Sequence, residues 1–219
     1  MNKFSGFRGW KYVNLPPNKT IALSMGTLAF ATIIPAVFET KDLFSLFFSH
    51  SKIEAKPKWY GFLFRKHFLT FLVFLGIVFM ILPFIMKSPW IWAFVWTGFI
   101  LLIDPILYLN KDKRSILSLI ERGEWASLLS IFLAGYVCGF LREFWNYWAH
   151  SKWIYTIPIL EKYKIFEIPV IGFLAYGPFA FELYDFYLLV RFVKWKLSYS
   201  LLKRAAELEL LKGLIRREV

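Results

Sequence analysis

Small and polar residues form a stripe along the apolar segment 125–148 and just beyond it. The members of the stripe are Gly135, Gly139, Glu143, Asn146 and His150. They recur at spacings of 4, 4, 3 and 4, so they share one face of a helix. The two glycines let another helix approach closely, and the polar half of the stripe faces the bundle or a cavity. A carboxylic acid held there has the chemistry of a general acid.

Other charged residues lie close to this stripe or in neighbouring apolar segments. Arg142 lies beside it and is expected to neutralise a carboxylate on a neighbouring helix. Glu182 and Asp185 follow Pro178, which removes a helix hydrogen bond and predicts a kink, so the two acids indicate a pocket wall. Asp104 interrupts a third apolar run. Charged side chains in a membrane are costly, which makes all of them candidate functional residues.

The candidate residues fall into two groups that differ in predicted depth. The outer group is Glu143, Asn146, His150 and Glu167, and the inner group is Asp104, Glu182 and Asp185. Their depths differ by roughly 15 Å at the helical rise per residue. One compact cluster would therefore require the loop 151–166 to re-enter the membrane, which Pro158 permits.

Aromatic residues gather around the outer end of segment 125–148. They are Phe144, Trp145, Tyr147, Trp148, Trp153 and Tyr155. Their pattern is typical of an interfacial aromatic belt. The alternative is a lining for an extended apolar ligand, or for a cationic intermediate held against the ring faces.

Several familiar chemistries have no motif in the chain, and we expect no cofactor and no metal. Glycine-rich phosphate loops, HExxH, CxxC and GxSxG patterns are absent from the sequence, which disfavours nucleotide, zinc, thiol redox and serine hydrolase functions. A metal held by His150 with Glu143 or Glu167 is a weaker interpretation than an interfacial histidine.

The composition is that of a membrane protein. Of 219 residues, 58% are hydrophobic, 21% are aromatic and only 19% are charged, against roughly 45–50% apolar residues in soluble domains. The single Cys138 excludes a disulfide scaffold. The net charge of +12 indicates contact with anionic lipid head groups and loops kept in the cytoplasm, rather than nucleic acid.

The apolar runs predict an all-α fold, a polytopic helical bundle of about five transmembrane helices. Within a transmembrane domain at 1–190, the predicted spans cover about 20–38, 67–86, 89–109, 125–148 and 167–190. The short apolar run 43–48 predicts an interfacial or half-inserted helix. Residues 191–219 predict a cytoplasmic, basic, amphipathic helix that lies on the membrane surface or extends the fifth span; a helix that docks onto a partner is the alternative.

The distribution of Lys and Arg predicts the orientation. With five spans, the side that holds the C-terminus carries more than twice as many of these residues as the other side. Basic loops stay inside, so we expect a prokaryotic inner membrane protein with a cytoplasmic C-terminus. If the run 43–48 also crosses, the N-terminus moves inside.

The segment 138–182 resembles a family of uncharacterised bacterial integral membrane proteins. The shared patterns are EFWNYWA, KWxYTxP, KxFExP and GFLxxxPFAxE, preceded by WTGFILLID at 96–104. The chain also has a Trp- and Glu-rich span, then a Tyr-containing loop, then a span that is entered through Pro and carries acids. In this order of features it distantly resembles the small lycopene cyclases and carotenoid hydratases. That resemblance implies acid catalysis on an isoprenoid lipid without a cofactor, with Glu143, Glu167 and Glu182 as candidate acids.

Three functions remain open on the sequence. The first is an accessory or structural subunit, or a scaffold, of a membrane complex, with buried acids that pair with Arg142 or with a partner's basic residues. The second is the isoprenoid enzyme, and the third is a small transporter, although no inverted repeat is visible. Expected partners are membrane lipids, an isoprenoid or other apolar ligand, and other membrane subunits.

Overall fold

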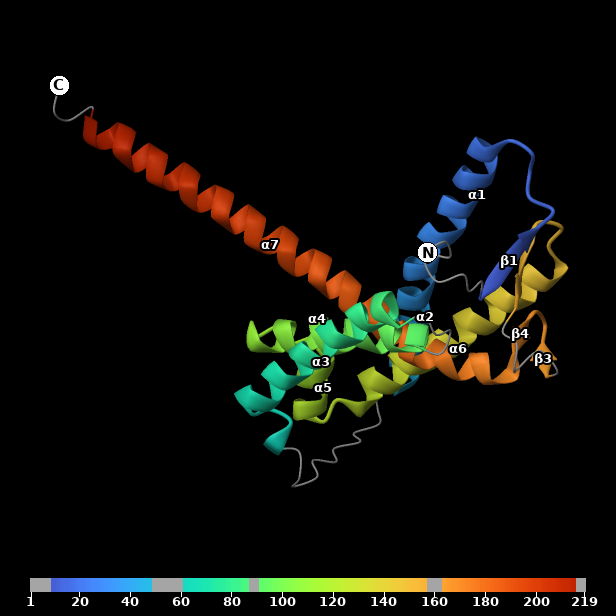
Figure 1. The fold of residues 1–219 in the computed structure, drawn as a ribbon. Coiled ribbons are helices and arrows are strands. Elements are labelled where there is room, and N and C mark those ends of the chain that lie inside the picture. Colours follow the sequence, from blue (N-terminus) through green and yellow to red (C-terminus); the bar gives the residue numbers. More distant parts are fainter. Residues whose placement is uncertain (1–8, 49–60, 87–90, 157–162, 216–219) are drawn as a thin grey trace.

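The computed structural model describes residues 9–48, 61–86, 91–156 and 163–215, and it is mostly helical there (Figure 1). The α-helices are α1 (Lys19–Ala31), α2 (Ile33–Phe48), α3 (Lys66–Ile85), α4 (Trp92–Leu109), α5 (Ile116–Arg122), α6 (Trp125–Trp148) and α7 (Tyr176–Ile215). The strands are β1 (Trp10–Val13), β2 (Lys152–Tyr155), β3 (Lys164–Ile165) and β4 (Ile168–Pro169), and the 3₁₀ helix η3 (Val170–Ala175) precedes α7.

The first two helices form one long apolar arm. The Asn18 side chain accepts hydrogen bonds from the backbone N–H groups of Thr20 and Ile21, which caps α1. Only Thr32 separates α1 from α2, and its N–H still bonds to the Leu28 carbonyl at 3.2 Å. The run 43–48, expected as an interfacial or half-inserted helix, forms the last turns of α2.

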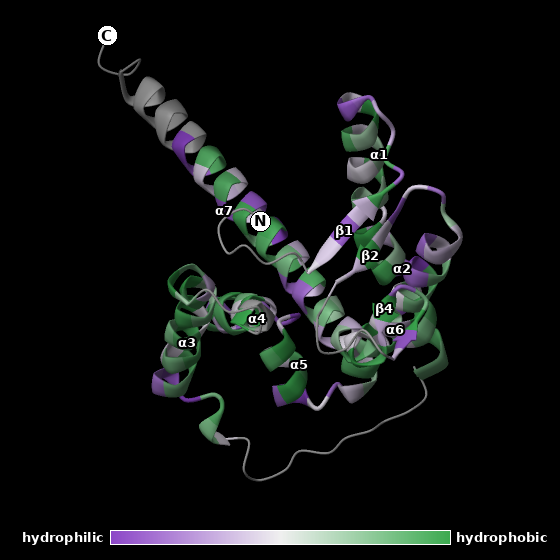
Figure 2. Ribbon diagram, turned by 45° about the vertical axis from the view of Figure 1, so that its right-hand side comes forward, coloured by the Kyte–Doolittle hydropathy of each residue, from purple (hydrophilic) through white to green (hydrophobic). Residues whose placement is uncertain are grey.

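Three helical stretches are long and apolar enough to cross a membrane: Lys19–Phe48, α3 and α6. The stretches α3 and α6 coincide with predicted spans, and Lys19–Phe48 contains the predicted span 20–38 but continues past it to residue 48; the apolar stretch identified in α4, Phe94–Leu109, is shorter. Figure 2 shows hydrophobic residues along α1 and α3, and many of their side chains are exposed, among them Leu23 and Phe84. Such surfaces are suited to lipid contact.

The start of the fifth predicted span is a short strand and a 3₁₀ helix instead of an α-helix. Residues expected to begin a helix at 167 form β4 and η3, and α7 begins only at Tyr176. The predicted kink at Pro178 is wrong, because Pro178 lies in the first turn of α7, where its missing N–H removes no helix hydrogen bond. Past residue 190 the helix continues unbroken to Ile215, so the basic tail extends α7.

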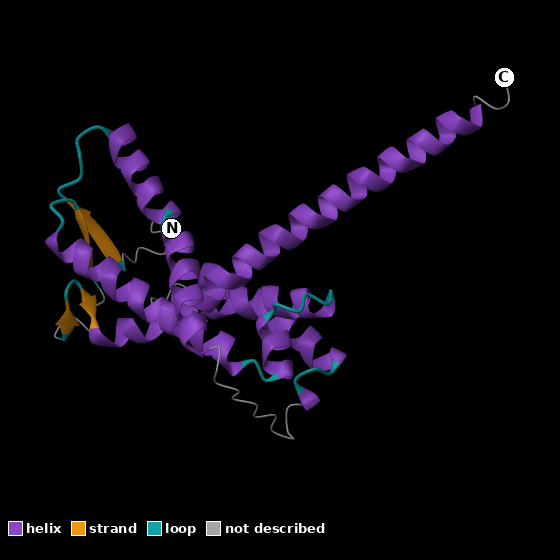
Figure 3. Cartoon of the chain, turned by 180° about the vertical axis from the view of Figure 1, so that it is seen from behind, coloured by secondary structure: helices purple, strands orange, loops and turns teal. Residues whose placement is uncertain are grey.

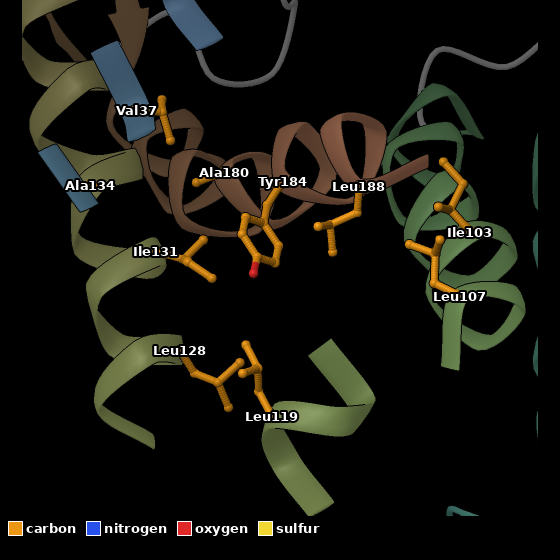
Figure 4. Close-up of a cluster of buried hydrophobic side chains, with 10 residues drawn as sticks. All are labelled: Val37, Ile103, Leu107, Leu119, Leu128, Ile131, Ala134, Ala180, Tyr184 and Leu188. Atoms are coloured by element: carbon orange, nitrogen blue, oxygen red, sulfur yellow. The ribbon is translucent and has the colours of Figure 1, made fainter. Parts of the chain in front are cut away.

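The helices pack in a chain of neighbours: α3 on α4, α4 on α7, α7 on α6, and α6 on α2. Gly76 lets α3 and α4 approach closely, since a Cβ there would lie 2.7 Å from the Leu102 backbone nitrogen. The buried core lies where α7 crosses α4 and α6, with Tyr184 and Leu188 of α7 between Ile131 and Leu107 (Figure 4).

Two small sheets lie at the end of the bundle where α6 stops and α7 starts (Figure 3). Strand β1 pairs antiparallel with β2, in a register that places Trp10 opposite Tyr155 and Val13 opposite Lys152. Strands β3 and β4 form the second pair. Of the loop expected to re-enter the membrane, residues 152–155 are a strand, and 157–162 lie outside the described residues.

Candidate functional site

Glu143 is the centre of a buried polar site made by α6, β2 and α7. Its side chain is fully buried in the last third of α6. The hydroxyls of Tyr155 and Tyr176 donate to the same carboxylate oxygen, Oε1, at 3.1 Å and 2.5 Å. The other oxygen, Oε2, is buried and has no hydrogen-bond partner within the described part of the chain.

The two glycines of the stripe bring Tyr176 to this carboxylate. A Cβ on Gly139 would lie 2.3 Å from Cγ of the Tyr176 ring, and one on Gly135 would lie 2.2 Å from the Tyr176 carbonyl oxygen. Both distances are far inside van der Waals contact, so only glycine fits at either position. The predicted close approach of another helix is thereby confirmed, and that helix is the start of α7.

Asn146 is the residue that holds β2 against α6. Its Nδ2 donates to the Trp153 carbonyl at 2.9 Å, and its Oδ1 accepts from the Trp153 backbone N–H at 3.0 Å. Both polar atoms of the amide are therefore engaged by the strand. Because Tyr155 lies two residues farther along β2, this pair of bonds also positions the Tyr155 hydroxyl over Glu143.

Arg142 lies between aromatic rings instead of beside a carboxylate. Its guanidinium carbon is 4.8 Å from the centroid of the Trp153 ring and 5.6 Å from that of Phe30, a residue of α1. The expected ion pair with a neighbouring carboxylate is not found among the described residues. The arrangement is a cation–π contact that joins α6, β2 and the apolar arm.

Tyr155 remains protonated at neutral pH. Burial and the nearby carboxylate of Glu143 raise the pKa of Tyr155 to about 12, and the Arg142 guanidinium opposes that effect in part. The Tyr155 hydroxyl therefore remains a hydrogen-bond donor to Glu143 throughout the physiological pH range.

Other members of the predicted outer group lie away from Glu143. The Glu167 carboxylate forms an ion pair with Lys152 at 2.6 Å, in the turn between β3 and β4. His150 is exposed, and its backbone carbonyl accepts a hydrogen bond from Asn14. Trp145 and Trp148 are 64% and 71% exposed, so they face outward from the site.

The predicted inner group forms a second buried site, where α4 meets α7. Asp104 Oδ1 accepts from the Ile116 N–H at 2.5 Å and Oδ2 accepts from the Leu117 N–H at 2.8 Å, which caps the start of α5. Asp185 and Glu182 are buried on α7. Asp185 follows Tyr176 by nine positions along α7, about 14 Å of helix, so the two groups are distinct.

Sequence reasoning missed Tyr176 and the cap on α5. The tyrosine is one of 11 in the chain, and only the GxxxG spacing of α6 hinted that a large residue would fill the gap. Ser115, whose hydroxyl oxygen accepts from the Ser118 N–H at 3.1 Å, was a readable helix start. Within the described ranges, no three His, Cys, Asp or Glu residues are placed to hold a metal ion.

Together, the fold and the two buried sites define a helical protein with several helices suited to a membrane and with carboxyl groups inside the bundle. Comparison with family models, with curated proteins and with solved structures gives no match to this chain.

Proposed function

We propose that this protein is an accessory subunit or scaffold of a membrane complex, embedded in a prokaryotic cytoplasmic membrane with its C-terminus in the cytoplasm. The observation that supports the proposal best is α7, which continues as one helix far beyond the other helices (Figure 1). Its 40 residues correspond to about 60 Å of helix. An apolar helix surface that leaves its own bundle has area to bury against another molecule.

The projecting part of α7 carries two apolar stripes on opposite sides. Its exposed apolar side chains include Val193, Trp195, Leu197, Tyr199, Leu201 and Leu202. Val193, Leu197 and Leu201 are four residues apart and form one stripe, and the other three form the second. The Trp195 and Tyr199 rings stack at a centroid distance of 5.9 Å. Each stripe is suited to pack against one helix of a partner.

Basic residues line the same part of the helix, which supports the cytoplasmic placement of the C-terminus. Between 191 and 204 the chain has five Lys or Arg residues and no acid: they are Arg191, Lys194, Lys196, Lys203 and Arg204. The orientation is tested with Ser200→Cys and an impermeant maleimide, in a Cys138→Ala background. Labelling in inverted vesicles but not in spheroplasts is expected, and the opposite result would reverse the orientation.

The subunit proposal is tested by native mass spectrometry of the gently purified protein. We expect a stoichiometric protein partner that is retained by wild type and lost by Leu197→Glu, which places a charge in the first stripe. Ser198→Glu adds the same charge between the two stripes and is the matched control. Retention of the partner in Leu197→Glu, or its absence from the wild-type preparation, would contradict the proposal.

A second candidate function, the isoprenoid enzyme, is supported by the unpartnered Oε2 of Glu143. In this alternative, a proton passes from Glu143 to one carbon of a C=C bond, and ring faces stabilise the carbocation that forms on the other carbon. Glu167 is engaged by Lys152 and Glu182 lies in the second site, which leaves Glu143 as the acid.

The enzyme alternative predicts a lipid phenotype for Glu143→Gln. Lipid extracts of cells that produce wild type should contain a cyclised or hydrated isoprenoid, and those with the variant should not. Folded variant protein, checked by size-exclusion chromatography, is the necessary control. An unchanged lipid profile with folded protein in both strains would exclude this function for Glu143.

A further inference from the structure

Two carboxyl groups from different helices meet in the core of the bundle. Asp104 of α4 is 3% exposed and Asp185 of α7 is fully buried. Their surroundings are apolar, because Ile103, Leu107 and Leu188 on the same helices belong to the buried core. The two side chains lie close enough to form a hydrogen bond with one another. Neither function proposed above uses this contact.

The two carboxyl groups have very different partners. Asp104 accepts hydrogen bonds from the Ile116 and Leu117 N–H groups, one at each oxygen, an arrangement that suits an ionised carboxylate. Both oxygens of Asp185 are buried. Neither of these two oxygens accepts a hydrogen bond from any donor in the described residues when both carboxyl groups are ionised. The contact between the two side chains becomes a hydrogen bond only when one carboxyl group holds a proton, because each is otherwise an acceptor only.

The charged groups around the pair do not provide a counterion for Asp185. Arg114 and Arg191 contact Asp112 instead, at 3.3 Å and 3.4 Å. Glu182, one turn before Asp185, is 3% exposed, and its buried Oε2 is also without a partner in the described part of the chain. A carboxyl group supplies no positive charge, and the nearby Tyr184 is neutral at physiological pH. Two adjacent carboxylates in such a place would repel strongly, whereas one shared proton replaces the repulsion with a charge-assisted hydrogen bond.

We propose that Asp104 and Asp185 form a proton-binding site inside the bundle, in which one proton lies between the two carboxyl groups and links α4 to α7. Asp104 is the acceptor, held by the start of α5, and Asp185 carries the proton. The site joins three helices through one dissociable atom. Loss of the proton would therefore separate α7 from α4. The contact between these two helices lies at the base of the projecting part of α7.

The proposal is tested by infrared difference spectroscopy of the full-length protein in lipid nanodiscs at neutral pH. A protonated carboxyl group has a carbonyl stretching band apart from the carboxylate bands. The difference spectrum of wild type minus Asp185→Asn should contain one such band, which is lost in the variant. The amide N–H of the new asparagine should donate to Asp104 and so keep the helices together. Glu182→Gln, a buried change one turn away, should leave that band in place.

Wild type alone provides a second measurement, which does not depend on the folding of a variant. The band that Asp185→Asn removes should disappear reversibly from wild type as the pH is raised. Thermal stability should fall with it, because the folded state then loses a proton that stabilised it. Three outcomes would overturn the proposal: no protonated carboxyl band in wild type, identical carboxyl bands in wild type and folded Asp185→Asn, or loss in Glu182→Gln of the same band that Asp185→Asn removes.

Discussion

The hydroxyl of Tyr176 donates to Oε1 of Glu143 at 2.5 Å, across the contact between α7 and α6. The bond is fully buried, and its donor comes from the first residue of α7. A hydrogen bond in a buried, apolar interior is stronger than one at the surface. This single contact therefore links the position of the carboxylate to the point at which α7 starts.

Removal of the Tyr176 hydroxyl should destabilise the bundle. Tyr176→Phe leaves Glu143 with one tyrosine donor, and we expect a loss of about 1–3 kcal/mol in the free energy of unfolding. The measurement is denaturant unfolding in mixed micelles. Tyr136→Phe is the control, since its hydroxyl is at the surface, 3.4 Å from the Leu174 carbonyl; equal losses for the two variants would argue against the buried bond.

A methyl group at position 139 should be much harder to accommodate than one at position 26. In Gly139→Ala the new Cβ would lie 2.3 Å from the Tyr176 ring, so α6 and α7 must separate, at a cost of about 1–3 kcal/mol. Gly26→Ala on α1 meets nothing within 4 Å and should be neutral or stabilising. Thermal unfolding measured by intrinsic tryptophan fluorescence distinguishes the two, and a normal transition for Gly139→Ala would disprove the close contact.

Loss of the Asn146 side chain should release β2 without unfolding the helices. Asn146→Ala removes both hydrogen bonds to Trp153, at a cost of about 1–3 kcal/mol for the polar groups left behind. Hydrogen exchange followed by mass spectrometry should then show faster exchange in 10–13 and 152–155. Asn110→Ala, which removes an exposed bond to the Ile106 carbonyl, should leave these peptides unchanged, and unchanged exchange in Asn146→Ala would refute the positioning role.

The raised pKa of Tyr155 predicts a specific alkaline sensitivity. Its value of about 12 in the folded protein compares with 10.0 for an unperturbed tyrosine, so between these values the unfolded state loses its proton while the folded state retains it. The free energy of unfolding should therefore fall as the pH rises from about 10 to 12. Melting temperatures across this range should fall less steeply for Tyr155→Phe; parallel curves for variant and wild type would contradict the prediction.

The long apolar helices and the inward face of α6 could be predicted from sequence. Uninterrupted apolar runs predicted 67–86 and 125–148, where the structure has α3 at Lys66–Ile85 and α6 at Trp125–Trp148. The helical spacing also placed Glu143 and Asn146 on one buried face. Both predictions depend only on local pattern, because hydrophobic length and period are properties of the segment itself.

The partners of those residues depend on contacts that no local pattern contains. Tyr155 and Tyr176 follow Glu143 by 12 and 33 residues. Tyr155 belongs to the predicted aromatic cluster, but its bond to Glu143 was not predicted, and nothing in the neighbourhood of Tyr176 distinguishes it from other tyrosines. Pro178 was misread because a proline kinks a helix interior but is accommodated in a first turn. Which of the two applies depends on where α7 begins, and its first residue, Tyr176, packs on Gly135 and Gly139 of α6.

The pairing of β1 with β2 has a topological consequence. Two strands that share hydrogen bonds lie on the same side of a bilayer, so a membrane-embedded form of this chain would cross the bilayer an even number of times between Val13 and Lys152. The three stretches that are long and apolar enough to span, Lys19–Phe48, α3 and α6, all lie in that interval. Three crossings alone would put the two strands on opposite sides. The predicted span 89–109, whose helix α4 has 18 residues, about 27 Å of helix packed along α3, would make the number of crossings even.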